Sequence, residues 1–353
     1  MRQIAKRAGV SIGTVSHVIN GTAGVRDNLR QRVLEAIRHL NYQPSQLGRG
    51  LRRSRTSMLG MIIPDVTNPF FPAVVRGVED IAYSRSYRVV LCNTDNDPAK
   101  EIAYLNQLES YRPVGLLLIP AAESRISGPL KKLAASGAPV VCIDRQPPGW
   151  RGDVVMVANE EGTYNATRHL LRMGHRCLAV ITGPQHLSNA VERLKGFLRA
   201  TEEASMAVEP EYIQPARFDR HTGYQAAMRL LRMLPRPTAI LACNDMMALG
   251  TLQAVRESNL RCPEDISIVG FDNLEFTEFT FPALTTVHQP GYQLGATAAR
   301  RLLERIDGSS ARPRKIFLQT ELKTRNSVAA PQVRTPDLQP EIAKHHAVAA
   351  HLE

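Results

Sequence analysis

The chain has 353 residues, which is enough for two or three domains with buried cores. Apolar residues make up 43% and charged residues 22% of the sequence, and these ordinary globular values exclude wholesale disorder. The longest nearly pure apolar run, 114–122, is well short of the ~18 residues that span a bilayer. No apolar segment of a secretory signal follows the first basic residues. We therefore expect no membrane partner.

The five cysteines are scattered, odd in number and never spaced as CxxC. This pattern argues against a disulfide scaffold and a structural zinc site, and it fits a reducing compartment, so we expect a cytoplasmic protein. The sequence contains no GxSxG, HExxH or phosphate-binding GxxxxGK motif, and no GxGxxG follows a predicted strand. We therefore expect no catalytic residues, no metal and no cofactor.

Charge is distributed unevenly along the chain. Residues 1–56 hold eleven Lys and Arg against two Asp and Glu, which gives this segment a net charge of +9 out of a total of +11. The rest of the chain is nearly neutral. A basic segment on a neutral body is typical of a protein that binds a polyanion, although a solvated basic surface is the alternative.

The first forty residues predict three short helices. The first carries an apolar stripe, and Ser11 stands at the N-cap position of the second, which ends at Asn20-Gly21. Asp27 opens the third, whose buried face should consist of Leu29, Val33, Ile37 and Leu40. Two short helices joined by a glycine-containing turn indicate a helix-turn-helix. An ordinary three-helix cap is the alternative, and the basic charge favours DNA.

A helix-turn-helix presents the N-terminal end of its second helix to the major groove. Here that end carries Ile12, Gly13, Thr14, Ser16 and His17, with Asn20 further along. Hydroxyl and amide groups of this kind bind phosphates and base edges.

The stretch 44–57 predicts a hinge helix that forms on DNA and is a linker without it. Pro44 suits a first helical turn, and Leu47 and Leu51 fall on one face. Gly48 and Gly50 make the helix marginal alone. Four arginines here could hold phosphates: Arg49, Arg52, Arg53 and Arg55.

Beyond the hinge, strand-like runs alternate with amphipathic helical runs, which predicts parallel sheets covered by helices. The strands are expected at 58–64, 88–94, 114–120, 139–144 and 154–158, then at 177–183, 212–218, 239–244 and 267–272. Helices are expected at 71–84, 159–173, 222–234 and 245–257, and 285–290 as an extended crossover. So many strands predict an α/β core of two doubly wound parallel-sheet lobes.

Polar residues gather where these strands end. Asp65 and Asn68 follow one strand of the first lobe, and Asn244-Asp245 and Asp272-Asn273 follow strands of the second. Ligands of open α/β sheets bind beyond the carboxyl ends of the strands, so two facing lobes would enclose a ligand cleft. Any single Asp or Asn here could be a helix N-cap, but the coincidence across both lobes favours a ligand site.

Ordered motifs throughout the chain resemble those of the lactose/galactose repressor (LacI/GalR) family of bacterial transcription regulators. They are IAKRAGVS at 4–11, TVS at 14–16, VING at 18–21, GMIIPD at 60–65, NPFF at 68–71, LCNTD at 91–95, GHR at 174–176, RLKGF at 193–197, NDMMALG at 244–250 and VGFD at 269–272. The resemblance implies a helix-turn-helix head, a hinge helix, and a core like that of periplasmic sugar-binding proteins. It further implies a homodimer on a near-palindromic operator of double-stranded DNA, controlled by a small-molecule effector.

Site residues follow from the resemblance position by position. Ile12, Gly13 and His17 match the base-reading positions, Thr14, Ser16 and Asn20 match DNA-backbone contacts, and Leu51 matches a hinge leucine that wedges into the minor groove. Arg193 and Asp272 match the main polar effector contacts, and Phe70, Phe71, Arg145, Asn189, Phe218 and Asn244 match other lining positions. His17 stands where arginine is usual and Gly13 where a long polar side chain is common, so the operator sequence stays open.

We expect these boundaries: a head at 1–43, the hinge at 44–57, a first core lobe at 58–157 with 290–316, and a second at 158–289 with 317–329. The Pro- and Ala-rich composition of 330–353 predicts a disordered tail. We expect a repressor whose effector is a sugar first and a nucleobase second. A periplasmic-type solute-binding protein is the alternative, but it would need a signal peptide and has no use for a basic head. An enzyme on this frame would need a catalytic pair or cofactor loop that the sequence lacks.

Overall fold

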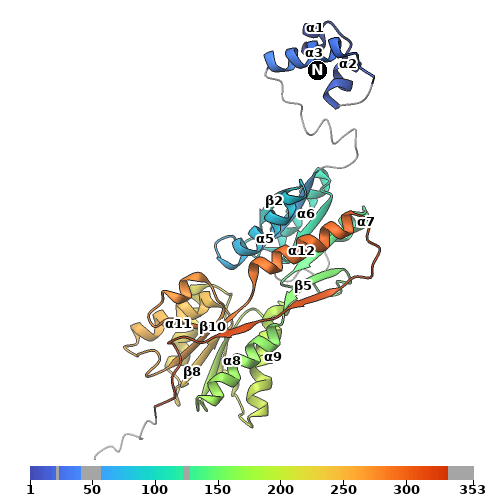
Figure 1. Ribbon diagram of the computed structural model, residues 1–353. Coiled ribbons are helices and arrows are strands. Elements are labelled where there is room, and N and C mark those ends of the chain that lie inside the picture. The colour runs from blue at the N-terminus through green and yellow to red at the C-terminus, as the bar shows by residue number, and fades with distance from the viewer. Residues whose placement is uncertain (21–23, 41–56, 122–127, 333–353) are drawn as a thin grey trace, which may run out of the picture. The chain divides into compact units, whose positions relative to one another are not determined.

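The computed structural model describes residues 1–20, 24–40, 57–121 and 128–332. The chain divides into an N-terminal head and a larger core, and each is a separate unit (Figure 1). The predicted hinge helix, including Arg49, Leu51 and Arg52, lies outside the described residues, as does most of the predicted tail.

The head contains three helices: α1 (Arg2–Ala8), α2 (Ile12–Asn20) and α3 (Asp27–His39). Their apolar faces form one small core of Ile4, Ala5, Ala8, Val15, Val18, Val33 and Ala36. The N-cap prediction is confirmed, because Ser11 Oγ accepts a hydrogen bond from Thr14 N–H at 3.1 Å. The prediction that Leu40 is buried is wrong: α3 ends at His39, so Leu40 lies past the buried face and is exposed.

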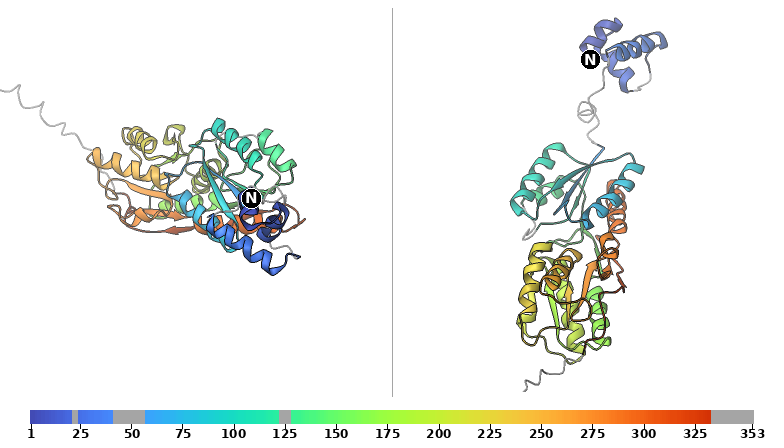
Figure 2. Two further views of the ribbon diagram at one scale, coloured as in Figure 1. Left: turned by 90° about the horizontal axis from the view of Figure 1, so that it is seen from above. Right: turned by 90° about the vertical axis from the view of Figure 1, so that its left-hand side faces the viewer.

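The first core lobe is a sheet of six parallel strands in the order β11-β5-β4-β3-β1-β2. Its strands are β1 (Met58–Ile63), β2 (Arg88–Asn93), β3 (Gly115–Leu118), β4 (Val140–Ile143), β5 (Asp153–Val157) and β11 (Lys315–Leu318). The helices of this lobe are α5 (Phe70–Ser84), α6 (Pro98–Tyr111), α7 (Gly128–Ala135) and α12 (Gly291–Ile306). Helices lie on both sides of the sheet (Figure 2).

The second lobe repeats this plan with the strand order β12-β10-β9-β8-β6-β7. Its strands are β6 (Leu178–Thr182), β7 (Ile213–Pro215), β8 (Ala239–Ala242), β9 (Ser267–Asp272), β10 (Thr285–His288) and β12 (Glu321–Lys323), of which only β12 is antiparallel. Four α-helices and two short 3-10 helices complete it: α8 (Asn159–Arg172), α9 (Ser188–Glu203), α10 (Arg220–Leu231), α11 (Asp245–Glu257), η1 (Pro210–Tyr212) and η2 (Glu275–Glu278). The predicted fold class is confirmed.

Three chain segments join the lobes: β5 leads into α8, β10 into α12, and β11 into β12. The segment 285–290 was expected to be a crossover, but most of it is β10 within the second sheet, and only Gln289 and Pro290 cross. Strand β11 continues to Leu318 in the first sheet, two residues past the expected boundary at 316. The predicted strand 212–218 ends at Pro215, because the chain turns at Phe218 with φ of 65°.

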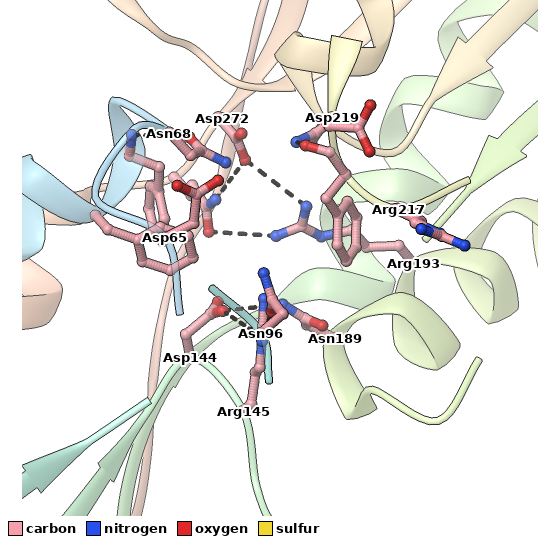
Figure 3. A pocket seen from close by; sticks show the side chains of 15 residues that line it. Asp65, Asn68, Asn96, Asp144, Arg145, Asn189, Arg193, Arg217, Asp219 and Asp272 are labelled. Atoms are coloured by element: carbon pink, nitrogen blue, oxygen red, sulfur yellow. Dashed lines mark hydrogen bonds and ion pairs between the residues drawn. The ribbon is translucent and has the colours of Figure 1, made fainter. Parts of the chain in front are cut away.

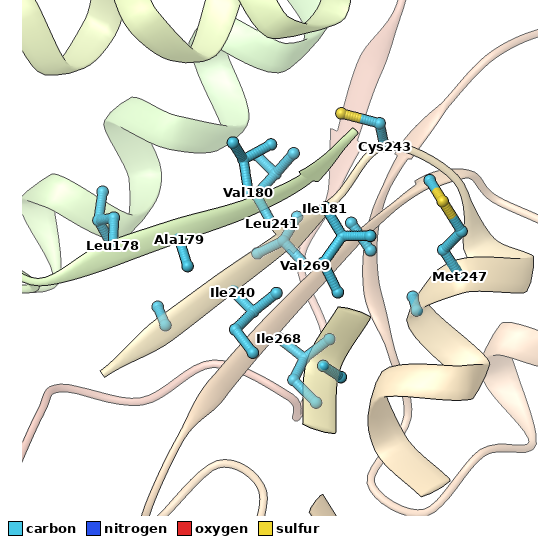
Figure 4. Close-up of a cluster of buried hydrophobic side chains, with 14 of the residues drawn as sticks. Leu178, Ala179, Val180, Ile181, Ile240, Leu241, Cys243, Met247, Ile268 and Val269 are labelled. Carbon is cyan, nitrogen blue, oxygen red and sulfur yellow. The ribbon is translucent and has the colours of Figure 1, made fainter. Parts of the chain in front are cut away.

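Each lobe has its own apolar core along its central strands. In the second lobe, side chains of β6, β8 and β9 interdigitate, among them Val180, Ile240 and Ile268 (Figure 4). These three are fully buried, and burying such a side chain stabilises the fold by roughly 1.5–3 kcal/mol. Because central parallel strands are covered on both faces, they read as continuous apolar runs, which is why they were predictable.

A buried ion cluster ties α12 to the first sheet. Asp153 on β5 accepts hydrogen bonds from Arg301 Nε at 2.8 Å, Arg305 Nε at 2.7 Å and the Arg314 N–H at 2.8 Å. Burial alone would raise the pKa of Asp153, but these bonds outweigh it and hold the pKa below its usual value. The cluster therefore contributes stability at neutral pH that is lost as the pH falls through the depressed pKa.

We expect Asp153→Ala to lower the free energy of unfolding by about 3–5 kcal/mol, because the buried Arg301 and the partly buried Arg305 lose the only buried carboxylate that pairs with them among the described residues, and Arg301 keeps only the exposed Glu304. Urea unfolding of the full chain measures this change. The matched control is Asp307→Ala, which breaks an exposed ion pair with Arg85 at 3.8 Å and should cost less than about 1 kcal/mol. Equal effects of the two substitutions would contradict the assigned role of Asp153.

Candidate functional site

A polar pocket lies between the lobes at the carboxyl ends of their strands. This position beyond the strand ends is where open α/β sheets bind their ligands. All eight residues predicted to contact an effector line it: Phe70, Phe71, Arg145, Asn189, Arg193, Phe218, Asn244 and Asp272. Figure 3 shows the side chains of both lobes pointing toward one space.

Arg193 on α9 is the most heavily bonded side chain of the pocket and is 3% exposed. Its Nε donates to Asn159 Oδ1 at 2.9 Å and its Nη1 to the Cys243 carbonyl at 2.6 Å. The guanidinium lies 3.8 Å from the centroid of the Phe271 ring and 3.7 Å from Asp272 Oδ1. These contacts fix its orientation and leave N–H groups for a ligand.

Asp272 ends β9 and faces Arg193 across the pocket (Figure 3). Burial raises its pKa well above the usual value, and the nearby Arg193 offsets this only in part. Its carboxylate is therefore incompletely compensated by the protein, and a ligand that donates hydrogen bonds would stabilise the charged form.

Another wall of the pocket contains residues from both lobes: Asp144 and Arg145 from the first, and Asn189 from the second. Asn189 Nδ2 donates to Asp144 Oδ2 at 2.9 Å, and Arg145 Nη1 donates to Asn96 Oδ1 at 3.0 Å. Three atoms of this group are buried with no hydrogen-bond partner: Asp144 Oδ1, Asn189 Oδ1 and Arg145 Nε. Buried polar atoms are rarely left unpaired, and these three belong to residues that line the pocket.

The aromatic residues supply the apolar surface of the pocket. Phe70 and Phe71 at the start of α5 make an edge-to-face pair with centroids 5.2 Å apart. Phe218 lies over Arg193, with the guanidinium carbon 5.7 Å from the ring centroid. Asn244 has a structural role as well, because its Oδ1 caps α11 through Met247 N–H at 2.9 Å and its Nδ2 donates to the Phe218 carbonyl.

Strained backbone also concentrates at this pocket. Four lining residues other than glycine have positive φ: Asn96 (56°), Asp144 (62°), Phe218 (65°) and Asp272 (127°). A positive φ is uncommon for Asp and an outlier for a bulky residue such as Phe. Strain of this kind persists where a functional arrangement requires it, which agrees with a ligand site.

Seven further lining residues were absent from the predicted contacts: Asp65, Asn68, Asn96, Asp144, Arg217, Asp219 and Gln289. Asp65 and Asn68 are among the polar residues that the sequence places after a strand, and Asp144 likewise follows β4 directly, so the end of an apolar run is a usable signal for all three. Gln289 lies in the expected crossover. Asn96, Arg217 and Asp219 lie in loops whose paths depend on residues with positive φ, and no sequence pattern marked them.

In the head, the predicted DNA contacts occupy different environments along α2. Ile12, Gly13 and His17 are exposed, Thr14 is half-buried, and Ser16 is 7% exposed on the buried face. The Thr14 hydroxyl bonds to Ser11 Oγ at 3.0 Å. The backbone of Asn20 ends the helix, and its side chain is outside what the structure describes.

The head presents many cations to solvent. All seven Lys and Arg residues between 1 and 40 are exposed: Arg2, Lys6, Arg7, Arg26, Arg30, Arg32 and Arg38. No ion pair is found among the described head residues 1–20 and 24–40. A set of uncompensated, exposed cations is the electrostatic requirement for binding phosphates.

The described residues contain no cluster of His, Cys, Asp and Glu placed to hold a metal ion. Within the same ranges, no helix combines the length and apolar character needed to span a membrane.

Known proteins share both parts of this architecture. The family model for bacterial regulatory proteins of the lacI family matches residues 1–45, and the model for the periplasmic binding protein-like domain matches residues 167–328. The HTH-type transcriptional repressor PurR of Histophilus somni (strain 2336) is 38% identical over 329 residues, which cover 93% of this chain and 98% of that protein.

Two solved structures are also similar to the chain. One is the lac repressor dimer bound to operator and the anti-inducer ONPF, with a TM-score of 0.80, 26% identity, and 93% of this chain and 98% of that chain covered. The other is the complex of the transcriptional regulator CelR with cellobiose, with a TM-score of 0.72, 31% identity, and 92% and 98% covered.

A helix-turn-helix head on a periplasmic-binding-protein-like core defines a class of DNA-binding regulator that carries its own effector-binding domain. The chain belongs to the LacI family of bacterial transcription regulators. It is a DNA-binding transcriptional repressor with an effector-binding core, and not an enzyme.

Proposed function

We propose that the protein binds a near-palindromic operator as a homodimer and that a neutral sugar in the interlobe pocket controls this binding. The proposed effector contacts are the eight predicted lining residues, with Arg193 and Asp272 as the main polar contacts. A repressor acts on cellular DNA, so we also propose a cytoplasmic location.

The unpaired oxygens of Asp144 and Asn189 are the observation that carries the sugar proposal. Both are buried acceptors and they come from opposite lobes, so a ligand that satisfies them must donate hydrogen bonds to both. Adjacent hydroxyl groups of a sugar do this, and Asp272 offers a third acceptor across the pocket. The aromatic rings suit the apolar face of a sugar ring.

The charge of the pocket argues against an anionic effector. Four acidic residues line it, Asp65, Asp144, Asp219 and Asp272, against three arginines, so the pocket has no excess positive charge that would favour a phosphate or carboxylate. CelR, a similar regulator, is solved with cellobiose, which supports a neutral sugar. A nucleobase is the second candidate, because Phe218 could stack on it.

For the head, we propose that Ile12, Gly13 and His17 read bases, since they are exposed at the N-terminal end of α2. Exposed Ile12 suits contact with a thymine methyl group. We propose that Thr14, Ser16, Asn20, Arg49 and Arg52 contact the DNA backbone. The proposed role of Leu51 is a minor-groove wedge at the operator centre.

An exposed apolar surface on the second lobe supports the proposed homodimer. Phe279 and Phe281 are 79% and 102% exposed, and they line one groove with Leu249 and Leu252. Large exposed apolar side chains gathered in one place mark protein–protein contacts. The lac repressor, which is similar to this chain, is solved as a dimer on its operator.

A melting screen tests the effector class. We expect the full-length protein to be stabilised by one of D-ribose, D-glucose, D-galactose or cellobiose, because a ligand at 100 times its Kd adds about 2.7 kcal/mol to the free energy of unfolding. Nucleosides, nucleobases and sugar phosphates complete the panel. Stabilisation by a nucleobase or sugar phosphate, with none by any neutral sugar, would overturn the sugar proposal.

A further inference from the structure

Gln289 holds the two main polar side chains of the pocket from a segment that joins the lobes. Its Nε2 donates to Asp272 Oδ1 at 2.5 Å, and its Oε1 accepts from Arg193 Nη2 at 3.4 Å. Gln289 is 3% exposed and lines the pocket. With the Arg193–Asp272 ion pair, these contacts form a closed triangle of three side chains.

The backbone at Gln289 leads directly from β10 into α12. The Gln289 N–H donates to the Asp272 carbonyl at 3.3 Å, and the Gln289 carbonyl accepts from Gly291 N–H at 2.9 Å, where α12 begins. The same residue therefore touches the pocket with its side chain and the first turn of a first-lobe helix with its backbone.

The backbones of α12 and α5 are in close contact. A Cβ on Gly77 of α5 would lie 2.0 Å from the Tyr292 carbonyl oxygen, and one on Gly295 of α12 would lie 2.0 Å from the Val74 carbonyl oxygen. Contact this close leaves no room for side chains between the helices, so α5 and α12 move as one body.

The α5–α12 pair also contacts the pocket through α5. Helix α5 starts with Phe70 and Phe71, which line the pocket, and the Phe70 ring lies against Gly291, where a Cβ would be 3.3 Å away. The α5–α12 pair therefore reaches the pocket at two places: at the start of α12, next to Gln289, and at the start of α5, at Phe70 and Phe71. A movement of Gln289 would act on the first of these.

We propose that Gln289 is a positioning residue that reports the occupancy of the pocket to the first lobe. The Gln289 amide occupies hydrogen-bonding positions on Asp272 and Arg193 that effector hydroxyls would also use. A bound effector displaces the amide, which releases the crossover and shifts the α5–α12 pair. This inference rests on the proposed effector site. It adds a structural connection by which effector binding would change the first lobe, which follows the head in the sequence.

Asn159 provides a useful contrast at another crossover. Its Oδ1 accepts from Arg193 Nε at 2.9 Å, and its Nδ2 donates to Glu192 at 3.0 Å. Asn159 does not line the pocket, so it orients Arg193 without occupying effector positions. Its removal should weaken effector binding more than removal of the Gln289 amide does, because the amide competes with the effector for Asp272 and Arg193.

The test compares Gln289→Met, which keeps the length of the side chain but loses the amide, with Asn159→Ala and the wild type. Exposed Gln293 on α12 gives the control Gln293→Ala. The probe is whichever of D-ribose, D-glucose, D-galactose or cellobiose shifts wild-type melting most. Two quantities are measured on the full-length chain: the Kd for that sugar, and the factor by which saturating sugar changes operator affinity.

We expect Gln289→Met to lose less sugar affinity than Asn159→Ala, while its coupling factor falls to below about 2, from a wild-type value in the usual range of roughly 5–150. Gln293→Ala should match the wild type, and Asn159→Ala should lose sugar affinity. An unchanged coupling factor in Gln289→Met overturns the proposal, and so does a loss of sugar affinity equal to that of Asn159→Ala.

Hydrogen exchange without sugar separates this inference from the proposed function. In Gln289→Met, amides at the start of α12 (291–294) should exchange faster than in Gln293→Ala, because the crossover has lost its side-chain anchor. Equal exchange overturns the role of Gln289. If no sugar binds the wild type but exchange does rise, the sugar proposal has failed and the anchoring role of Gln289 stands.

Discussion

Substitution of Arg193 by alanine is expected to abolish the effector response while operator binding persists. Arg193 is buried and held by Asn159, Cys243 and Asp272, with N–H groups left for a ligand. A methyl group can replace neither its hydrogen bonds nor its charge beside Asp272. A hundredfold rise in Kd would cut the stabilisation at the same sugar concentration from about 2.7 to about 0.4 kcal/mol.

The measurement is the melting shift produced by the sugar that stabilises the wild type most. Arg199→Ala is the matched control, because Arg199 lies on the same helix but pairs with Glu160 and Glu161 at the surface. Arg193→Lys is a second variant that keeps a positive charge near Asp272 and is therefore less prone to unfold. Its melting shift with the sugar should still be small, because lysine lacks the planar set of N–H donors of a guanidinium. A normal melting shift in Arg193→Ala would refute the effector assignment.

The architecture was predictable because it depends on patterns that survive in a single sequence. Central strands such as β6 and β9 are buried on both faces and read as apolar runs, and α5, α8 and α11 were expected to within a residue or two. Elements at the edge of a sheet were harder to predict. The predicted strand around β7 was too long because a turn at Phe218 ends it, and no local pattern reveals a positive φ at a phenylalanine.

The pocket was predicted in part for the same reason. Residues at the end of a strand or just past it, such as Asp272 and Asn244, are marked by the end of an apolar run, and the resemblance to a known family supplied their roles. Gln289 and Asn96 are brought to the pocket by tertiary structure: one by the chain crossing between lobes, the other by a bond to Arg145. Interactions between distant segments leave no periodic signal in the sequence.

Deletion of residues 1–56 is expected to remove operator binding completely and to leave a folded core that still binds the sugar. This segment holds +9 of the net charge of +11, and the head is a separate unit with its own small apolar core. The core has a larger apolar cluster in each lobe, so it does not depend on the head for stability. The rest of the chain is nearly neutral and offers no comparable attraction to phosphates.

Salt dependence tests the same assignment in the intact protein. Each phosphate that an exposed cation neutralises releases condensed counterion, so the logarithm of operator affinity should fall with the logarithm of salt concentration, with a slope near −0.9 per contact. Removing one contributing cation, for example by Arg7→Ala, should make the slope shallower by about 0.9 if that side chain contacts phosphate. The control is Lys195→Ala, which removes an exposed cation from the core and should leave the slope unchanged. A core lacking residues 1–56 that still bound the operator with the full salt dependence would show that the DNA-binding surface lies elsewhere.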